Sequence, residues 1–472
     1  MSLLRQKAPL IREKRLNAIA AYYGKAETLL TENEKEKQFL QRVRTYSQDA
    51  PSDILYALNV IATIKDAAIV VHGGAGCAAA RLTFNLFDEN NGKWAVTNLN
   101  ERDSIMGSEV KLRETIKQVY KLHSPKIVFI ISTPIVAINN DDIESVVDEL
   151  NEDLGIAIVP VYSDGFRSKV GATGYDIVSH SIVKRILNTK KDSVGNHVNL
   201  LSVSEKPSDL KEVTRLLQEL GLQTNVFPRF SSFENIQQAK NAAFSIAINS
   251  DEADYPGKIF QDRFEIPYIQ SVLPVGIANT SQWLTDIAIA TGRKSEVQSL
   301  LSREKEKLHS LLKKKDISMR KVFISLTPAY GIALYELFEE LGFEVVGVKL
   351  SYIDQLHLAF VEKIQAERPD LALFVGDGQL FEEENVIRKI KPDLYIGNAS
   401  DFAVAVRNGI PVINIQSISI IGFEGVLNLV GKIRKTLANT SFTQLVAQSE
   451  NKSYTNEWLK KSTNWFIKQE VK

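Results

Sequence analysis

Short apolar runs alternate with amphipathic stretches along most of this chain, a pattern typical of parallel β-strands joined by helices. Residues 126–131 (KIVFII) are almost entirely apolar, residues 139–150 have helical spacing, and residues 156–162 (IAIVPVY) form the next apolar run. A continuous apolar run indicates a strand that is buried on both faces of its sheet. Strand, helix and strand at this spacing predict a parallel βαβ unit.

The same order of elements returns twice, at residues 199–227 and at residues 321–348. The helices of these two repeats end in similar sequences, LLQELG at residues 216–221 and LFEELG at residues 337–342. A glycine in that position suits the end of a helix. The repeated units predict an α/β fold of three Rossmann-like domains, each built on a parallel sheet.

The repeats divide the chain into segments, in agreement with the rule that one core stops growing at about 250 to 300 residues. We predict an N-terminal helical extension at 1–50, a first α/β domain at 51–195, a second α/β domain with a connector helix at 196–317, a third α/β domain at 318–435 and a C-terminal helical tail at 436–472. The connector, residues 296–315, is rich in lysine. A solvated helix is the favoured interpretation of such a charge run, and a docking face is the alternative.

Composition excludes several classes of function. Lys and Arg number 57, Asp and Glu also number 57, and this balance gives no electrostatic case for nucleic-acid binding. No stretch reaches about 18 uncharged apolar residues, so we expect no membrane span. Charged residues interrupt every apolar run of the N-terminus, which argues against a signal peptide. With a single cysteine and therefore no internal disulfide, the chain is expected to be cytoplasmic.

The sequence HGGAGC at residues 72–77 holds that cysteine and directly follows the apolar run 67–71. Glycines allow the backbone to approach a ligand closely, and open α/β sheets bind ligands at the carboxyl ends of their strands. A lone free cysteine is also a common small buried hydrophobe, so both interpretations of Cys77 stay open at this point. One cysteine cannot build a metal site alone, and further ligands would have to come from another chain. For His72 in the same loop, structural packing is the favoured role.

Common catalytic motifs are absent from the sequence. No GxGxxG stands in register before a helix, no GxxxxGK[ST] occurs, and no GxSxG is present, so neither a nucleotide pocket nor a serine nucleophile is supported. Residues 98–107 enter an amphipathic helix, where Asp103 or Ser108 is expected to cap a helical turn.

Six stretches between about residues 50 and 435 resemble stretches of the nitrogenase component 1 family and stand in the same order along the chain. The resemblance implies three α/β domains and an α2β2-type complex that receives electrons from an ATP-dependent iron protein. It also implies an iron–sulfur cluster between two unlike subunits. The stretches are VVHGGAGC (70–77), NLNERDSIMGSEVKL (98–112), STPIVAINNDDIESV (132–146), VPVYSDGFRSKVGATGYD (159–176), VLPVGIANTSQWLTDIA (272–288) and KPDLYIGNASDFAVAVRNGIPV (391–412).

The cysteine pattern departs from that of the nitrogenase subunits. Of the three cysteines that the family uses for this cluster, only the middle one is present, as Cys77, while Pro51 and Thr133 stand near the other two positions. The β-like scaffold subunit of the family is similar in keeping one cysteine while its partner supplies three. The resemblance therefore implies that Cys77 is one thiolate ligand of a 4Fe-4S cluster shared with a cysteine-richer homologous subunit. Residues 244–248 and 417–424, near the family's positions for anchoring the iron–molybdenum cofactor, hold neither Cys nor His, which implies no such anchor here.

The same resemblance assigns further site residues. Gly76, Cys77 and Arg167 are the predicted cofactor-binding residues, with Cys77 as the metal ligand. The Arg167 guanidinium suits an anionic group, and an ion pair with Asp164 is an equal alternative. Two loops border the predicted site: Glu101, Arg102 and Asp103 on the partner-facing loop, and Ser163, Asp164, Phe166 and Arg167 at the cluster or substrate cavity.

The function implied is that of a β-like subunit of a nitrogenase-like oxidoreductase, which is not expected to catalyse a reaction alone. One alternative is a scaffold that assembles a nitrogenase-type metal cofactor without turnover. Another is a structural partner subunit that holds no cluster.

Overall fold

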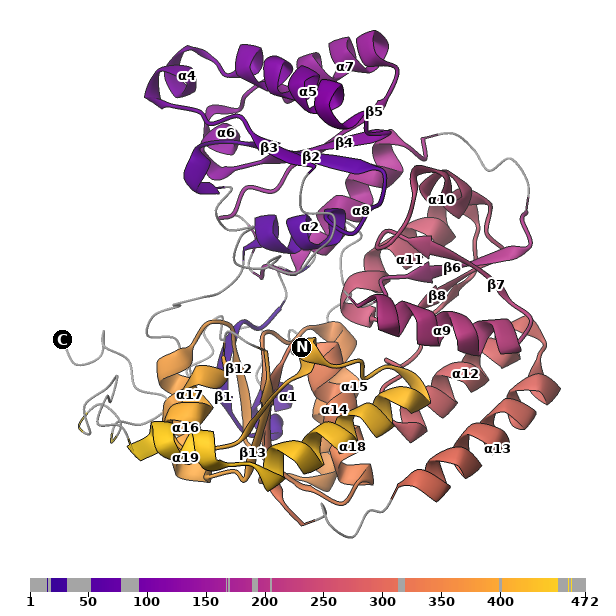
Figure 1. Cartoon of the computed structure of the whole chain (residues 1–472), viewed down its shortest axis with the longest axis vertical. Helices are drawn as coiled ribbons and strands as arrows, with labels where there is room; N and C mark the ends of the chain where they lie inside the picture. The colour runs from indigo at the N-terminus through magenta and orange to yellow at the C-terminus, as the bar shows by residue number, and fades with distance from the viewer. Residues whose placement is uncertain are drawn as a thin grey trace.

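The computed structural model describes residues 15, 18–31, 52–77, 93–166, 168, 170–188, 194–203, 206–312, 319–398, 401–448, 457 and 460. The strands of this part form three sheets, each in its own α/β lobe (Figure 1). Lobe 1 has the strand order β3-β2-β4-β5, lobe 2 has β7-β6-β8-β9, and lobe 3 has β1-β12-β11-β10-β13-β14. The predicted α/β fold with parallel sheets is thereby confirmed.

Lobe 1 is a parallel sheet covered by helices on both faces (Figure 1). Alternate residues of its strands enter two apolar clusters, one with α2 and α8 and one with α5 and α7, so the sheet is buried on both sides. The strands are β2 (Ala67–His72), β3 (Trp94–Val96), β4 (Ile127–Ser132) and β5 (Ala157–Val161). The helices are α2 (Asp53–Ile61), α4 (Glu101–Met106), α5 (Glu109–His123), α6 (Pro134–Asn139), α7 (Ile143–Leu154) and α8 (Thr173–Arg185).

Lobe 2 repeats this plan with a second parallel sheet and leads through α12 and α13 to lobe 3. The predicted connector helix is α13, which buries Val297, Leu300 and Leu308 and pairs Glu304 with Arg215 at 2.8 Å. One face of the connector is therefore packed. The elements are β6 (His197–Leu201), α9 (Pro207–Glu219), β7 (Gln223–Phe227), α10 (Phe233–Gln238), η3 (Ala239–Asn241), β8 (Phe244–Ala247), α11 (Ser250–Phe264), β9 (Tyr268–Ile269), α12 (Ile277–Thr291) and α13 (Lys294–Leu311).

Lobe 3 has the largest of these sheets, and α18 packs back against α12 and α9 of lobe 2. Its elements are β10 (Lys321–Leu326), α14 (Pro328–Glu340), β11 (Glu344–Leu350), η5 (Gln355–His357), α15 (Leu358–Glu367), β12 (Leu373–Gly376), α16 (Leu380–Ile390), β13 (Leu394–Gly397), α17 (Phe402–Arg407), β14 (Val412–Asn414), η6 (Ile415–Ser417), α18 (Gly422–Ala438) and α19 (Ser441–Gln448).

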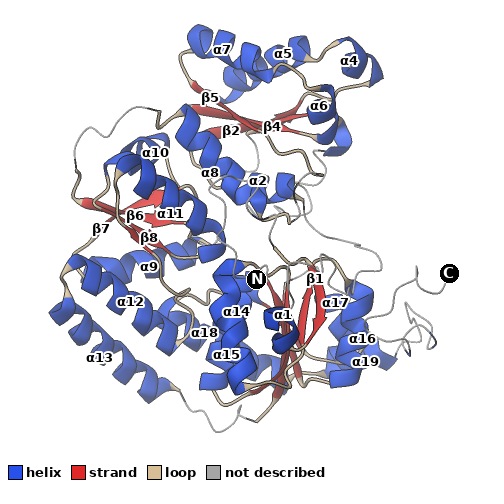
Figure 2. Ribbon diagram, turned by 180° about the vertical axis from the view of Figure 1, so that it is seen from behind, coloured by secondary structure: helices blue, strands red, loops and turns tan. Residues whose placement is uncertain are grey.

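The N-terminal segment differs from the helical extension expected at residues 1–50. Residues Ala21–Gly24 form strand β1, which pairs antiparallel with β12 at the edge of the lobe 3 sheet (Figure 2). The short helix α1 (Ala26–Thr31) follows and contacts α15. Aromatic residues favour strands, and Tyr22 is fully buried in this one. Pairing also covers an edge of β12 that would otherwise expose unpaired backbone groups.

Within the residues that the structure describes, no helix combines the length and apolar character needed to cross a membrane.

Candidate functional site

The glycine and cysteine loop leaves lobe 1 at the carboxyl end of β2, a strand that is buried along its whole length. A Cβ atom on Gly73 would lie 2.3 Å from Thr133 Oγ1, so only glycine fits this close approach. Residues 75–77 then form a helical turn, in which the Cys77 N–H donates to the Gly74 carbonyl at 3.1 Å. The loop therefore presents its thiol at the edge of the lobe.

Cys77 is half-buried, with one side packed against the apolar cluster that α2 and α8 share with the sheet. The neighbouring Gly76 is exposed, and a Cβ atom there would meet none of the described atoms within 4 Å. A thiol with one packed side and an open neighbour is more accessible than an ordinary core cysteine. This environment fits a ligand that meets a metal arriving from outside the chain.

His72 is fully buried and has both ring nitrogens in hydrogen-bond contacts. Its Nδ1 lies 3.1 Å from Thr97 Oγ1 and its Nε2 lies 3.0 Å from Ser108 Oγ, while the Ser108 hydroxyl donates to Asp141. Burial lowers the pKa of His72 to about 4, so the ring is neutral at pH 7. Burial also raises the pKa of Asp141, and the bond from Ser108 opposes that rise. His72 acts as a packing residue beneath the loop, in agreement with the role favoured from the sequence.

Two threonines fix the backbone of the loop. The Gly73 N–H donates to Thr97 Oγ1 at 2.9 Å, and the Thr133 hydroxyl donates to the His72 carbonyl at 2.7 Å. Thr133, which the resemblance places at the family's downstream cluster cysteine, has a side chain that is fully buried and bonded inside the lobe. Pro51, near the upstream position, lies outside the described residues. Thr133 therefore has a structural role in the loop.

The predicted partner-facing loop forms α4. Asn100 caps this helix and makes a reciprocal capping box with Asp103, with distances of 3.1 and 2.9 Å. Asp103 thus contributes to a cap, as expected, whereas the Ser108 hydroxyl turns to His72 and Asp141 and does not cap α5. Sequence reasoning missed Asn100, although Asn followed three residues later by Asp is a recognisable start signal.

Exposed apolar side chains gather beside this helix. Ile105 is 81% exposed and Met106 is 76% exposed on α4, and Ile138 is 68% exposed on α6. The two helices touch, since the Asn139 side-chain amide donates to the Ser104 carbonyl at 2.7 Å. We call Ile105, Met106 and Ile138 the α4–α6 surface. Clustered exposed apolar residues mark interaction surfaces. The sequence analysis did not identify these three residues, because they do not follow a helical apolar pattern.

The loop after β5 lies close to the same edge. Ser163 and Asp164 are buried, Phe166 is 52% exposed, and Arg167 lies outside the described residues. A Cβ atom on Gly165 would meet Pro134 Cγ at 3.3 Å, which places this loop beside the start of α6. The loops after β2 and β5 therefore lie on either side of residues 133–134. The assignment of Arg167 to an anionic group stays a prediction.

Asp53, which sequence reasoning missed, holds the β5 loop in place. One carboxylate oxygen accepts from the Gly165 N–H at 2.9 Å and the other from the Ser168 hydroxyl at 3.1 Å. Burial raises the pKa of Asp53, and the bond from Ser168 opposes that rise. A carboxylate that accepts from a loop N–H and from a loop hydroxyl is a structural anchor.

Among the described residues, no three His, Cys, Asp or Glu side chains lie close enough together to hold a metal ion. Cys77 as a metal ligand therefore stays a prediction.

Three Rossmann-like lobes, with a glycine-flanked cysteine after the first strand of lobe 1, define a three-domain α/β protein that presents a single thiol. The chain belongs to the nitrogenase component 1 type oxidoreductase family, whose family model matches residues 52–438.

Several characterised proteins are similar over most of their length. The nitrogenase iron-molybdenum cofactor biosynthesis protein NifE of Clostridium pasteurianum is 27% identical over 394 residues, covering 80% of this chain and 85% of the relative. The NifE protein of Methanococcus maripaludis strain S2 is 25% identical, covering 78% of each chain. The nitrogenase vanadium-iron protein beta chain of Trichormus variabilis is 27% identical, covering 75% of this chain and 83% of the relative.

A solved structure supports the fold. The structure described as nitrogenase Cp1 at pH 5 superposes with a TM-score of 0.78 at 16% sequence identity, covering 94% of this chain and 98% of that one. At this identity the match establishes the shared architecture.

Proposed function

We propose that this chain is a β-like subunit of a nitrogenase-like oxidoreductase complex. In this proposal it supplies Cys77 as one thiolate ligand of a 4Fe-4S cluster shared with a cysteine-richer homologous subunit. The observation that carries the proposal is the half-buried Cys77 thiol, which a glycine loop presents at the edge of lobe 1.

The donor chemistry fits a shared cluster. Iron–sulfur clusters are held by several thiolates, and a single sulfur from one chain leaves the others to a partner. Thiolate is also a softer ligand than the nearby Thr133 hydroxyl, which is already bonded inside the lobe. Among the described residues, no atom lies within 4 Å of a Cβ atom built on Gly76, which leaves room on this side of the loop for a bulky inorganic group.

The other loop residues position the ligand. Thr97 and Thr133 bond the backbone of the loop, and the neutral His72 ring supports it without adding a charge beneath the thiol. When bound, the cluster would supply electron transfer, with an ATP-dependent iron protein as the electron donor. The protein contributes fixed geometry, backbone N–H groups and burial, which are the means by which proteins tune such groups.

The α4–α6 surface is the region that we assign to contact with the partner subunit. The start of this surface is joined to the loop that carries Cys77. The Leu99 N–H, just before α4, donates to the Gly73 carbonyl of that loop at 2.9 Å. A partner that supplies the remaining ligands has to approach this edge, and the exposed Ile105, Met106 and Ile138 side chains offer it apolar contact.

The test is to co-purify the full chain with a homologous subunit that carries three cysteines, and then to measure iron per complex and the electron paramagnetic resonance signal. We expect Cys77→Ala to lose most of the shared-cluster signal while the two chains still co-purify. Ala75→Ser, an exposed position in the same turn, is the matched control and should keep the iron. Full iron content and an unchanged signal in Cys77→Ala would contradict the proposal.

Gly76→Ala gives a second readout. The added methyl group meets no described atom of this chain and stands in a helical turn, so the isolated variant should be at least as stable to denaturant as the parent. In the complex, the same methyl group faces the proposed cluster, and we expect lower iron content. A variant that keeps its full iron content would show that nothing lies against Gly76.

A scaffold for metal-cofactor assembly is the second candidate function, because two of the similar proteins are named as cofactor biosynthesis proteins. Both candidates require iron in the purified complex. Adding an ATP-dependent iron protein, ATP and a reductant separates them, since an oxidoreductase reduces a substrate and a scaffold does not. A complex without iron would instead indicate a structural partner subunit.

A further inference from the structure

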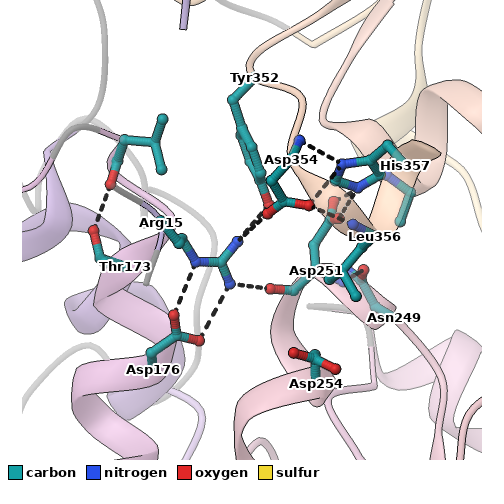
Figure 3. Close-up of polar contacts among 12 residues, drawn as sticks. Arg15, Thr173, Asp176, Asn249, Asp251, Asp254, Tyr352, Asp354, Leu356 and His357 are labelled. Atoms are coloured by element: carbon teal, nitrogen blue, oxygen red, sulfur yellow. Dashed lines mark hydrogen bonds and ion pairs between the residues drawn. The ribbon is translucent and has the colours of Figure 1, made fainter. Parts of the chain in front are cut away.

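A buried arginine from the N-terminal segment lies where the three lobes meet (Figure 3). Arg15 Nε and Nη2 donate to the two carboxylate oxygens of Asp176 on α8 of lobe 1, at 2.9 and 3.2 Å. Nη1 donates to the Tyr352 hydroxyl of lobe 3 at 2.7 Å, and Nη2 also donates to the Asp251 carbonyl on α11 of lobe 2. One guanidinium group thus contacts all three lobes.

Each lobe brings a carboxylate to this junction. Asp176 comes from lobe 1, Asp251 from lobe 2 and Asp354 from lobe 3. His357 lies between two of them, with Nε2 3.0 Å from Asp251 Oδ1 and Nδ1 3.0 Å from Asp354 Oδ1. Buried carboxylates repel one another unless cations and hydrogen bonds compensate them. Burial opposes protonation of His357, but Asp354 and Asp251 raise its pKa to about 10, so His357 is one cation of the junction. Arg15, whose Nη1 is also 4.0 Å from Asp354, is a second cation and connects Asp176 of lobe 1 to this cluster.

The rest of the N-terminal segment is attached to lobe 3 independently of Arg15. Ile19 and Ile353 exchange two backbone hydrogen bonds of 2.7 and 3.0 Å, and β1 pairs with β12 along its full length. Ile19 and Tyr22 pack in the apolar cluster of lobes 2 and 3. Ala18 instead packs with residues of lobes 1 and 2. The segment therefore leaves lobe 3 at Ile19 and enters the junction of the three lobes at Ala18.

We propose that Arg15 and residues 18–24 act as a closing strap, in which β1 is the fixed end on lobe 3 and Arg15 is the clamp that holds lobes 1 and 2 against it. Withdrawal of Arg15 leaves the β1–β12 pairing intact but removes the bonds to Asp176, to the Asp251 carbonyl and to Tyr352. His357 still lies between Asp251 and Asp354, so the contact that loosens is the one that holds α8 of lobe 1 to the other two lobes. This inference does not depend on Cys77 or on any bound cluster.

The test is hydrogen–deuterium exchange on the full chain, with small-angle X-ray scattering to report the overall dimensions. In Arg15→Ala we expect exchange to rise by roughly tenfold or more in peptides from α8, α11 and residues 351–357, because a local opening replaces a closed junction. Peptides from the β1–β12 pair should keep their protection, and the radius of gyration should increase.

Lys25→Ala is the matched control. Lys25 lies on the same segment and pairs with Asp370 at 2.8 Å, but both groups are largely exposed and both lie on the lobe 3 side. Its removal should leave exchange in α8 and α11 unchanged.

Arg15→Lys keeps the charge and loses the planar fork, so it should give a smaller, equally localised rise in exchange. This variant decides the question if Arg15→Ala does not fold. Unchanged exchange in α8 and α11 would overturn the proposed strap. An equal rise in exchange across all three sheets would also overturn it, because that result reports general destabilisation of the fold.

Discussion

At the scale of single residues, burial decides which side chains serve as supports and which remain available. Thr133 and Ser108 have hydroxyl groups that the sequence alone leaves open to several roles. The structure bonds them to the His72 carbonyl and the His72 ring, respectively. Cys77 was predictable as the residue of interest because it is the single cysteine and follows a buried strand. Its neighbours' roles were not predictable, since they depend on contacts between distant loops.

His72 makes stability depend on pH. Its folded pKa of about 4 lies below the ordinary value of 6.5, so the unfolded chain takes up the proton first as pH falls. The contribution is complete above about pH 6.5 and is lost toward pH 4. We expect this residue to remove about 2 kcal/mol of unfolding free energy between pH 7 and pH 5.

Urea denaturation of the parent, of His72→Gln and of His309→Gln at both pH values measures this effect. The His72→Gln variant should be less stable at pH 7 but should lose less stability on acidification. His309, which is exposed, is the control and should follow the parent. Equal acid losses in all three proteins would show that His72 does not resist protonation.

At the scale of elements, the apolar runs predicted the central strands and helices of all three lobes well. For instance, the strand expected at 321–326 is β10, and the following helix begins at Pro328. Each of these elements is formed by a continuous segment of sequence and is packed in the core. The spacing of its apolar residues is therefore enough to predict it. Strand β1 was not predictable in this way, because it is only four residues long and its partner β12 lies far along the chain.

Helix α18 offers a matched pair of glycines. A Cβ atom on Gly425 would lie 2.1 Å from the carbonyl carbon of Ile420, a backbone atom that cannot move aside easily. For Gly431 in the same helix, no atom of the described part of the chain lies within 4 Å of such a Cβ atom. We expect Gly425→Ala to cost about 1 to 3 kcal/mol of unfolding free energy through overpacking. Gly431→Ala should gain about 0.5 to 1 kcal/mol through helix propensity.

Thermal and urea unfolding of the two variants checks this pair. Because the substitution is identical, a difference in sign isolates the contact with Ile420. Two stabilised variants would mean that the turn before α18 adjusts without cost.

At the scale of the whole molecule, the repeats predicted three domains, but they could not predict how the lobes meet. Arg15, Asp176, Asp251 and Asp354 come from four separate parts of the sequence, and nothing in their local patterns connects them. The α4–α6 surface was hidden for a related reason. Exposed apolar residues on short helices have no periodic signal, and their meaning appears only when the fold joins the start of α4 to the loop that carries Cys77.

Partner binding is the prediction that belongs to this scale. Met106 on the α4–α6 surface and Leu122 on α5 are almost equally exposed, at 76% and 75%, and both lie at the ends of helices of lobe 1 where a lysine is favourable. Met106→Lys places a charge in the proposed interface, where desolvation opposes binding, and should weaken association with the homologous subunit by about tenfold or more. Leu122→Lys should bind as the parent does.

Sedimentation equilibrium or a titration with labelled partner measures both affinities, and unfolding curves confirm that both variants fold. If Leu122→Lys weakens the complex and Met106→Lys does not, the partner approaches lobe 1 from the side of α5 away from the Cys77 loop. That result would contradict the assignment of the α4–α6 surface to the partner subunit. The partner has to bring its own thiolates to Cys77 to share a cluster, so a contact surface on the edge of lobe 1 that holds the Gly73 loop is the one that the proposed function requires. The two lysine variants test this requirement without any metal being present.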